Sequence, residues 1–172
     1  MKTLKFWTLC LFSFLVMAMG TSCSDDDNNE VDSAIAENKA NKEEGEQFLL
    51  ANKTAEGVVT TFSGLQYKIL ARGTGEKPIL SDSLTLVYTA KLIDGTIFMS
   101  DTEDLLLAHQ IEGLKEGVRY MPEGSSFVLY LPYYLGYDAT ERNFSYSGSS
   151  VKVKAYSVLM FECKLTRVKH NE

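Results

Sequence analysis

The stretch that decides the fold is Phe-Val-Leu-Tyr-Leu-Pro-Tyr-Tyr-Leu-Gly-Tyr, residues 127–137. Its first five residues alternate as in a strand, with Phe127, Leu129 and Leu131 on one face. Pro132 has no N–H to donate to a sheet, so we expect the strand to end there. The three tyrosines that follow either complete a core or, with their phenol groups, line a shallow apolar pocket for a short peptide.

Further strands are expected on both sides of this stretch. Residues 84–92 alternate cleanly between apolar and polar side chains, which points Tyr88 inward among aliphatic residues. Asp94-Gly95 is typical of a hairpin turn, with a return strand that begins at Thr96. The remaining strand-like segments are residues 65–70 and residues 151–168, the latter as one long strand or as two separated by a bend.

One short amphipathic helix is predicted over residues 110–120, where apolar side chains recur at helical spacing. Gly113 and Gly117 lower its helix propensity but allow a close approach to a sheet. Residues 99–110 and 138–154 are expected to be connecting loops. Antiparallel strands with one helix predict an α+β fold, in which a twisted antiparallel sheet wraps around one short α-helix.

Composition limits the classes of partner. The 172 residues suffice for one domain with a substantial core, and the net charge of −6 leaves no basic stripe for phosphates, so we expect no nucleic-acid partner. Cys163 is expected to be buried and inert, and no cysteine pair remains for a disulfide after processing. His109 and His170 lack ligand spacing, so no metal site and no cofactor are expected.

Residues 1–22 have the layout of a secretory signal peptide: Lys2 and Lys5, an apolar run over residues 6–19, and small residues before Cys23. The end of this segment resembles the cleavage site of bacterial lipoproteins. That resemblance implies lipidation of Cys23 and a membrane anchor on that residue, because several acyl chains on one cysteine bind a membrane firmly. The alternative is ordinary signal cleavage, with the cysteine as a bystander.

The segment between the leader and the domain is acidic first and helical later. Residues 24–30 are predicted to be a solvated, disordered tether, and the same run resembles a surface-export signal of lipoproteins. Residues 31–55 favour a helix without a sustained heptad repeat. The expected organisation is therefore a lipoprotein signal peptide (1–22), an acidic tether with a helix (23–55) and one folded domain (56–172).

Three sets of motifs resemble, in order and spacing, the FKBP-type peptidyl-prolyl cis-trans isomerases. They are Leu-Ile-Asp-Gly-Thr-Ile-Phe at 92–98, Glu-Gly-Val with Met-Pro-Glu-Gly-Ser within 116–125, and Leu-Tyr-Leu-Pro at 129–132. Segments within 41–70 are similar to the part that precedes the domain in members of the Mip kind. The resemblance implies an FKBP-like fold and proline-containing peptide or protein clients as partners. Because the family's long dimerising helices are missing, it also implies a monomer.

Carried over residue by residue, the resemblance implies a substrate pocket built from six residues: Tyr88, Phe98, Ile111, Leu114, Tyr137 and Phe161. In the family's pattern the backbone N–H at the position of Ile111 binds the substrate carbonyl. The phenol at the position of Tyr137 donates a hydrogen bond to the peptide. Leu114 stands where the family usually has a tryptophan at the floor of the pocket.

The sequence departs from the family pattern around this pocket. Met99 stands where active members carry an aspartate, and Phe144 and Tyr146 lie in a loop that lacks the family's Gly-Pro-Pro run. Two functions are compatible with these residues. The first is a prolyl isomerase that assists extracytoplasmic protein folding, as an outer membrane lipoprotein on the periplasmic or cell-surface face. The second is an FKBP-like surface module that binds peptide or another ligand with weak or no catalysis.

Overall fold

The structure, a computed structural model, describes residues 26–171. The predicted signal cleavage and the predicted lipidation of Cys23 lie outside these residues. The described elements are, in chain order, α1 (Asp26–Asn52), β1 (Val58–Thr60), β2 (Gln66–Ala71), β3 (Ser83–Lys91), β4 (Ile97–Leu106), η1 (Leu107–His109), α2 (Glu112–Val118), β5 (Ser126–Leu131), η2 (Tyr133–Leu135), β6 (Arg142–Tyr146), β7 (Ser149–Val153) and β8 (Leu159–Lys169). Among the helices of this range, none is both long and apolar enough to cross a membrane.

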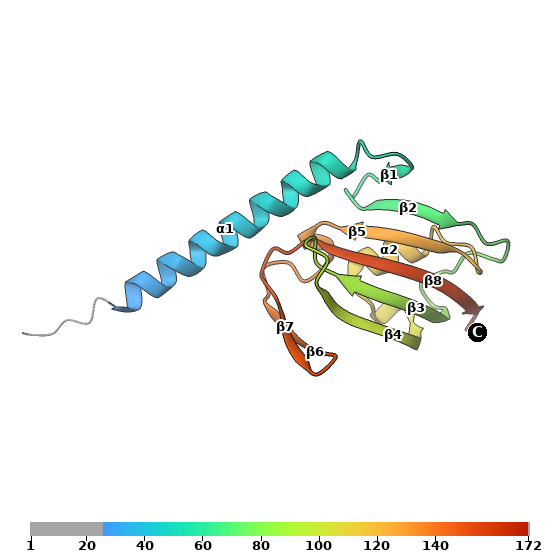
Figure 1. Ribbon diagram of the computed structural model, residues 1–172. Helices are drawn as coiled ribbons and strands as arrows, with labels where there is room; N and C mark the ends of the chain where they lie inside the picture. Colours follow the sequence, from blue (N-terminus) through green and yellow to red (C-terminus); the bar gives the residue numbers. More distant parts are fainter. Residues whose placement is uncertain (1–25, 172) are drawn as a thin grey trace, which may run out of the picture.

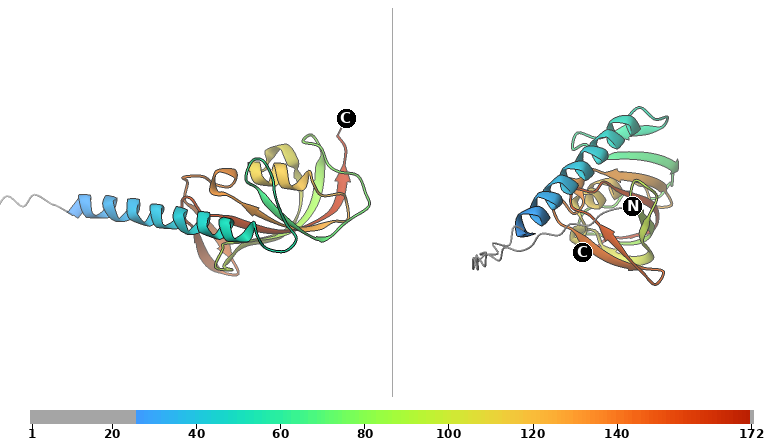
Figure 2. Two further views of the ribbon diagram at one scale, coloured as in Figure 1. Left: turned by 90° about the horizontal axis from the view of Figure 1, so that it is seen from above. Right: turned by 60° about the vertical axis from the view of Figure 1, so that its left-hand side comes forward.

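Six strands form one antiparallel sheet in the order β1-β2-β5-β8-β3-β4. The sheet curves around the short helix α2, and the core fills the space between them (Figures 1 and 2). β6 and β7 form a separate two-stranded hairpin beside the main sheet. The α+β class and the sheet wrapped around one helix are therefore confirmed.

β5 forms where the sequence predicted the central strand. Phe127, Leu129 and Leu131 are fully buried, and the strand ends at the residue before Pro132. β5 is hydrogen-bonded on both sides, to β2 and to β8. On β8 the thiol of Cys163 is buried, and burial raises its pKa to about 12, which agrees with the prediction of an inert cysteine.

α2 spans residues 112–118, fewer than the ten or so residues predicted. Its two glycines face β5, because a Cβ on Gly113 would collide with Leu131 and a Cβ on Gly117 would lie 2.6 Å from Leu129 Cδ1. The helix can therefore lie closer to the sheet than side chains at these positions would permit. The close approach to the sheet that was predicted from the two glycines is therefore confirmed.

Two segments that were predicted as loops contain strands. Residues 97–106 all belong to β4, which lies at the edge of the sheet and pairs only with β3. Its middle residues are exposed and polar, and several are charged, so the apolar alternation that marks a half-buried strand is missing there. β6 and β7 are joined at Ser147 and Gly148, which both have positive φ, as a tight two-residue hairpin requires.

α1 begins at Asp26, so the prediction of a disordered tether up to residue 30 is wrong for residues 26–30. The amino-terminal part of α1 projects beyond the rest of the molecule (Figure 2).

The second half of α1 is fixed to the folded domain. Asn41 Nδ2 donates to the carbonyl of Ala155 at 2.6 Å and lies 3.1 Å from Ser157 Oγ. Near the end of the helix, Asn52 donates to the side chain of Gln66, whose own Nε2 donates to the Leu49 carbonyl, both at 2.8 Å. Gln66 is almost fully buried, and these bonds satisfy its amide.

The contact between α2 and β5 predicts the effect of adding one methyl group. In Gly117→Ala the new Cβ meets the Leu129 side chain at less than van der Waals distance. We expect a loss of about 1–3 kcal/mol in the free energy of unfolding, measured by urea denaturation, although alanine favours a helix over glycine. The loss is expected to shrink when Leu129→Ala is the background. An equal loss in both backgrounds contradicts the close contact.

Candidate active site

Three of the six predicted pocket residues are rings from neighbouring strands of the sheet. Tyr88 on β3 and Phe161 on β8 have ring centroids 6.1 Å apart. Phe98 on β4 meets Phe161 edge to face at 6.3 Å. The strand pairing brings them together, because Ala90 of β3 lies opposite both Met99 of β4 and Phe161 of β8.

Two further predicted residues come from the start of α2. Leu114 is buried in the core cluster that contains the three rings, and Ile111 packs against this cluster while half-buried. Ile111 is the N-cap of the helix, so its N–H is among the donors that an α-helix leaves without an internal acceptor. Within residues 26–171 no hydrogen bond from this N–H to the protein is found. It is therefore a donor that a bound peptide can use.

The sixth residue, Tyr137, is connected to the other three rings by Phe144. The sequence places Phe144 in the loop that lacks the family's Gly-Pro-Pro run. Phe144 on β6 lies 5.7 Å from Tyr137 and 5.0 Å from Phe98, measured between centroids. The Arg142 guanidinium lies 5.7 Å from the centre of the Tyr137 ring. Burial raises the pKa of the Tyr137 phenol, and the Arg142 charge opposes part of that rise. We call Tyr88, Phe98, Tyr137, Phe144 and Phe161 the aromatic group.

Three rings of the aromatic group are almost fully buried. Phe98 and Phe161 are only 1% and 2% exposed, and Tyr88 is 7% exposed. Phe144 is half-buried and lies against the side of Phe98, where the resemblance predicted a pocket that admits a peptide. The β6–β7 hairpin thus contributes a further ring beside Phe98 through Phe144.

The Tyr88 hydroxyl has two acceptors on β4 within hydrogen-bond distance. Met99 Sδ lies 3.0 Å from the hydroxyl oxygen, and Glu103 Oε2 lies 3.2 Å from it. Burial raises the pKa of Tyr88, and the negative charge of Glu103 adds to the rise. Sequence reasoning missed Glu103, since residues 99–110 were predicted to be a loop. The strand periodicity of β4, once known, places residues 99, 101 and 103 on one face.

The other two tyrosines that follow Pro132 lie away from the aromatic group. Tyr133 packs against Tyr156 at 5.3 Å, with the Lys42 ammonium of α1 5.1 Å from its ring centre. Tyr134 donates its hydroxyl proton to the Ser63 carbonyl at 3.1 Å. Of the three tyrosines after Pro132, only the last therefore contributes to the predicted pocket.

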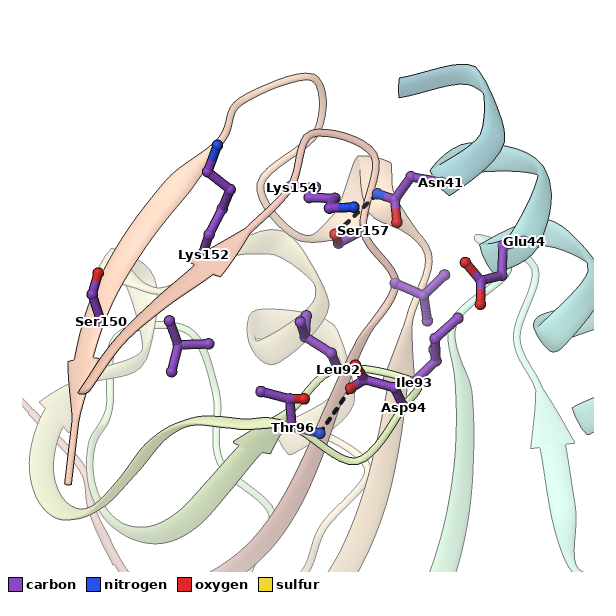
Figure 3. Close-up of a pocket in the computed structure, with 12 residues that line it drawn as sticks. Asn41, Glu44, Leu92, Ile93, Asp94, Thr96, Ser150, Lys152, Lys154 and Ser157 are labelled. Atoms are coloured by element: carbon purple, nitrogen blue, oxygen red, sulfur yellow. Dashed lines mark hydrogen bonds between the residues drawn. The ribbon is translucent and has the colours of Figure 1, made fainter. Parts of the chain in front are cut away.

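A separate hollow of about 390 Å³ lies between α1, the β3–β4 turn and β7 (Figure 3). It shares no lining residue with the aromatic group. Its lysines are already paired, Lys152 with Glu141 at 3.0 Å and Lys154 with Glu37 at 2.7 Å. Within the described part of the chain, no three His, Cys, Asp or Glu side chains are grouped to hold a metal ion.

Family models match two consecutive parts of the chain. Residues 74–166 match the FKBP-type peptidyl-prolyl cis-trans isomerase domain. Residues 17–69 match the domain described as amino terminal to FKBP-type peptidyl-prolyl isomerase. The second match overlaps the segment within 41–70 in which the sequence resembled members of the Mip kind.

Two curated relatives agree with these matches. A protein of Neisseria meningitidis, described as a probable FKBP-type peptidyl-prolyl cis-trans isomerase FkpA, is 38% identical over 77% of this chain and 48% of its own length. The outer membrane protein MIP of Legionella longbeachae is 43% identical over 56% of this chain and 44% of its own length. The chain thus spans about half the length of these curated relatives.

Solved structures share the fold. FkpA from Escherichia coli has a TM-score of 0.73 at 25% identity and aligns with 83% of this chain and 66% of its own. A peptidyl-prolyl cis-trans isomerase from Pseudomonas syringae has a TM-score of 0.68 at 25% identity, over 77% of this chain and 96% of its own. With a domain match that covers more than half of the 172 residues, this protein belongs to the FKBP-type peptidyl-prolyl cis-trans isomerase family.

Proposed function

We propose that this protein catalyses cis-trans isomerisation of X–Pro bonds in peptide and protein clients, and so assists protein folding outside the cytoplasm. The observation that carries the proposal is the aromatic group, in which four predicted pocket rings from β3, β4, β8 and the segment after β5 come together with Leu114 and Ile111. Membership in an isomerase family supports the same chemistry.

Such a site can catalyse the reaction without an acid, a base or a metal. The barrier to rotation about the X–Pro bond is about 18–20 kcal/mol and arises from amide resonance. The twisted transition state has lost this resonance, so its carbonyl is less polar than that of the planar ground state. An apolar aromatic wall therefore favours the transition state, and each 1.4 kcal/mol of such preference is worth about tenfold in rate. The N–H of Ile111, for which no acceptor is found within residues 26–171, is suited to hold the flanking peptide.

The Phe144 ring beside Phe98 and Tyr137 favours a second candidate, an FKBP-like module that binds a ligand with weak or no catalysis. Phe144 covers Phe98 and contacts Tyr137, so any proline-containing client competes with a ring of the protein itself. The two candidates differ in whether the wild-type protein accelerates isomerisation.

We further propose that the protein is a lipoprotein with the lipid on Cys23, held at the outer membrane on its periplasmic or cell-surface face. The signal-like leader and the small residues before Cys23 support an anchor, and the relative named as an outer membrane protein supports this location. Residues 1–22 would then be removed, residues 23–55 would link the anchor to the domain, and residues 56–172 would carry the activity. A monomer agrees with α1 packing on its own domain.

The enzyme proposal predicts that thinning the aromatic wall slows the reaction. In Phe98→Leu the side chain keeps most of its apolar volume but loses the ring that meets Phe161 and Phe144. We expect kcat/KM for a Leu-Pro peptide to fall about tenfold, in a protease-free isomerisation assay. Phe48→Ala is the control, because Phe48 is an aromatic residue of α1 that packs on Tyr130 instead. A wild-type protein without rate enhancement contradicts the enzyme proposal.

The position of Phe144 predicts a variant with higher activity. Phe144→Ala removes two ring contacts that a proline must otherwise replace, each worth about 0.5–1.5 kcal/mol. We expect the dissociation constant of a proline-containing peptide to fall about tenfold, measured by calorimetry, and kcat/KM to rise. Tyr146→Ala, which removes a ring from the same strand, is the control. Weaker binding in Phe144→Ala means that Phe144 is a wall of the pocket and not its cover.

A further inference from the structure

The hydroxyl of Tyr88 can donate only one proton, yet it lies near three side chains of β4. Asp101 is paired with Tyr88 across the two strands, and Met99 and Glu103 are the next residues on the same face, one on each side. Which of them accepts the hydrogen bond from the hydroxyl decides how the Tyr88 ring is held. Since Tyr88 forms one wall of the aromatic group, this choice bears on the proposed reaction.

Asp101 is not the acceptor, although a carboxylate that accepts one hydrogen bond can still accept others. Its carboxylate accepts the backbone N–H of Thr102 at 2.7 Å, and no bond to Tyr88 is found within the described residues. Its charge nevertheless contributes to the raised pKa of the Tyr88 phenol, so it lies close enough to influence the hydroxyl. Asp101 thus affects Tyr88 through charge alone.

Met99 and Glu103 both lie within bonding distance, but they differ in strength as acceptors. A thioether sulfur is a weak acceptor, whereas a carboxylate oxygen accepts strongly from a phenol hydroxyl. Glu103 Oε2 is 3.2 Å from the Tyr88 oxygen, within the range of a hydrogen bond. The Glu103 carboxylate is therefore the partner that engages the proton, and the Met99 thioether fills the space beside it.

We propose that Glu103 is a positioning residue of the active site, which fixes the Tyr88 ring in the pocket wall by accepting the hydrogen bond from its hydroxyl. The inference rests on the proposed isomerase function. With its proton engaged on β4, the hydroxyl is not available to bond a substrate carbonyl, and the wall stays apolar. A hydroxyl that is free to donate would stabilise the polar planar amide more than the twisted transition state and would slow the reaction.

The geometry also predicts which substitution restores the bond. In aspartate the carboxylate oxygens are as many bonds from Cα as the sulfur is in methionine. Met99→Asp therefore places an acceptor near the position of Sδ, which lies 3.0 Å from the Tyr88 oxygen. A carboxylate at residue 99 is then able to replace the one at residue 103.

The test measures kcat/KM for a Leu-Pro peptide with the full chain in mild detergent. We expect Glu103→Ala to lower kcat/KM about tenfold, in line with a hydrogen bond to a charged group. Asp101→Asn, which removes the same charge from the residue paired with Tyr88, is expected to stay within about twofold of wild type. Met99→Asp added to Glu103→Ala is expected to restore most of the activity. In a Tyr88→Phe background, Glu103→Ala is expected to have no further effect.

Two kinetic outcomes overturn the proposal. One is an equal fall in kcat/KM in Glu103→Ala and Asp101→Asn, which means that the negative charge near Tyr88, and not the hydrogen bond, supports the reaction. The other is a full loss from Glu103→Ala in the Tyr88→Phe background, which means that Glu103 does not act through Tyr88. Thermal unfolding of each variant shows whether a loss of activity reflects a loss of fold.

A readout without catalysis separates this proposal from the proposed function. The Tyr88 hydroxyl proton is followed by NMR in a chain with labelled tyrosine, with the signal assigned from Tyr88→Phe. We expect slow exchange with water in wild type and Asp101→Asn, fast exchange in Glu103→Ala, and slow exchange again when Met99→Asp is added. If wild type shows no isomerase activity but this pattern holds, the function fails and the positioning contact stands. The same exchange rate in wild type and Glu103→Ala overturns the contact.

Discussion

The close contact of α2 with β5 is the constraint on which the rest of the structure depends. Gly113 and Gly117 let the helix backbone approach Leu131 and Leu129 more closely than any side chain would permit. A helix held at this distance places its first turn, with Leu114, in the core cluster that also contains the sheet's aromatic rings. The sheet can then curve around the helix, and the candidate site forms between the start of α2 and the strands β3, β4 and β8.

The candidate site combines a rigid floor with a cover that belongs to a separate hairpin. The floor residues are buried within the main sheet, where each strand is held by its neighbours. Phe144 comes from the two-stranded hairpin β6–β7, which has no ladder bonds to that sheet. Two-stranded hairpins are marginally stable by themselves, so this one is the part of the site best able to move. In the proposed function, access of a client and the apolar character of the wall would depend on different elements.

α1 contributes to the same arrangement from outside the sheet. Asn41 bonds to Ala155 and Ser157, which lie in the short segment that joins β7 to β8. That segment is also the base of the hairpin that carries Phe144. α1, which would lead from the proposed membrane anchor, therefore directly contacts the segment that joins the β6–β7 hairpin to β8.

The resemblance to the family supplied the predicted pocket residues, of which five cluster with Phe161. The sequence by itself determined the strands whose apolar side chains alternate, the end of β5 at Pro132, and the close approach at Gly113 and Gly117. These features are local, because periodicity, a missing N–H or a missing Cβ acts on the nearest neighbours. Only the tertiary structure decided that residues 99–106 form a strand, that Phe144 covers Phe98, and that Glu103 reaches Tyr88. An exposed edge strand of charged residues has no apolar pattern, and the partners of its side chains lie on another strand, so their contacts depend on pairing across the sheet.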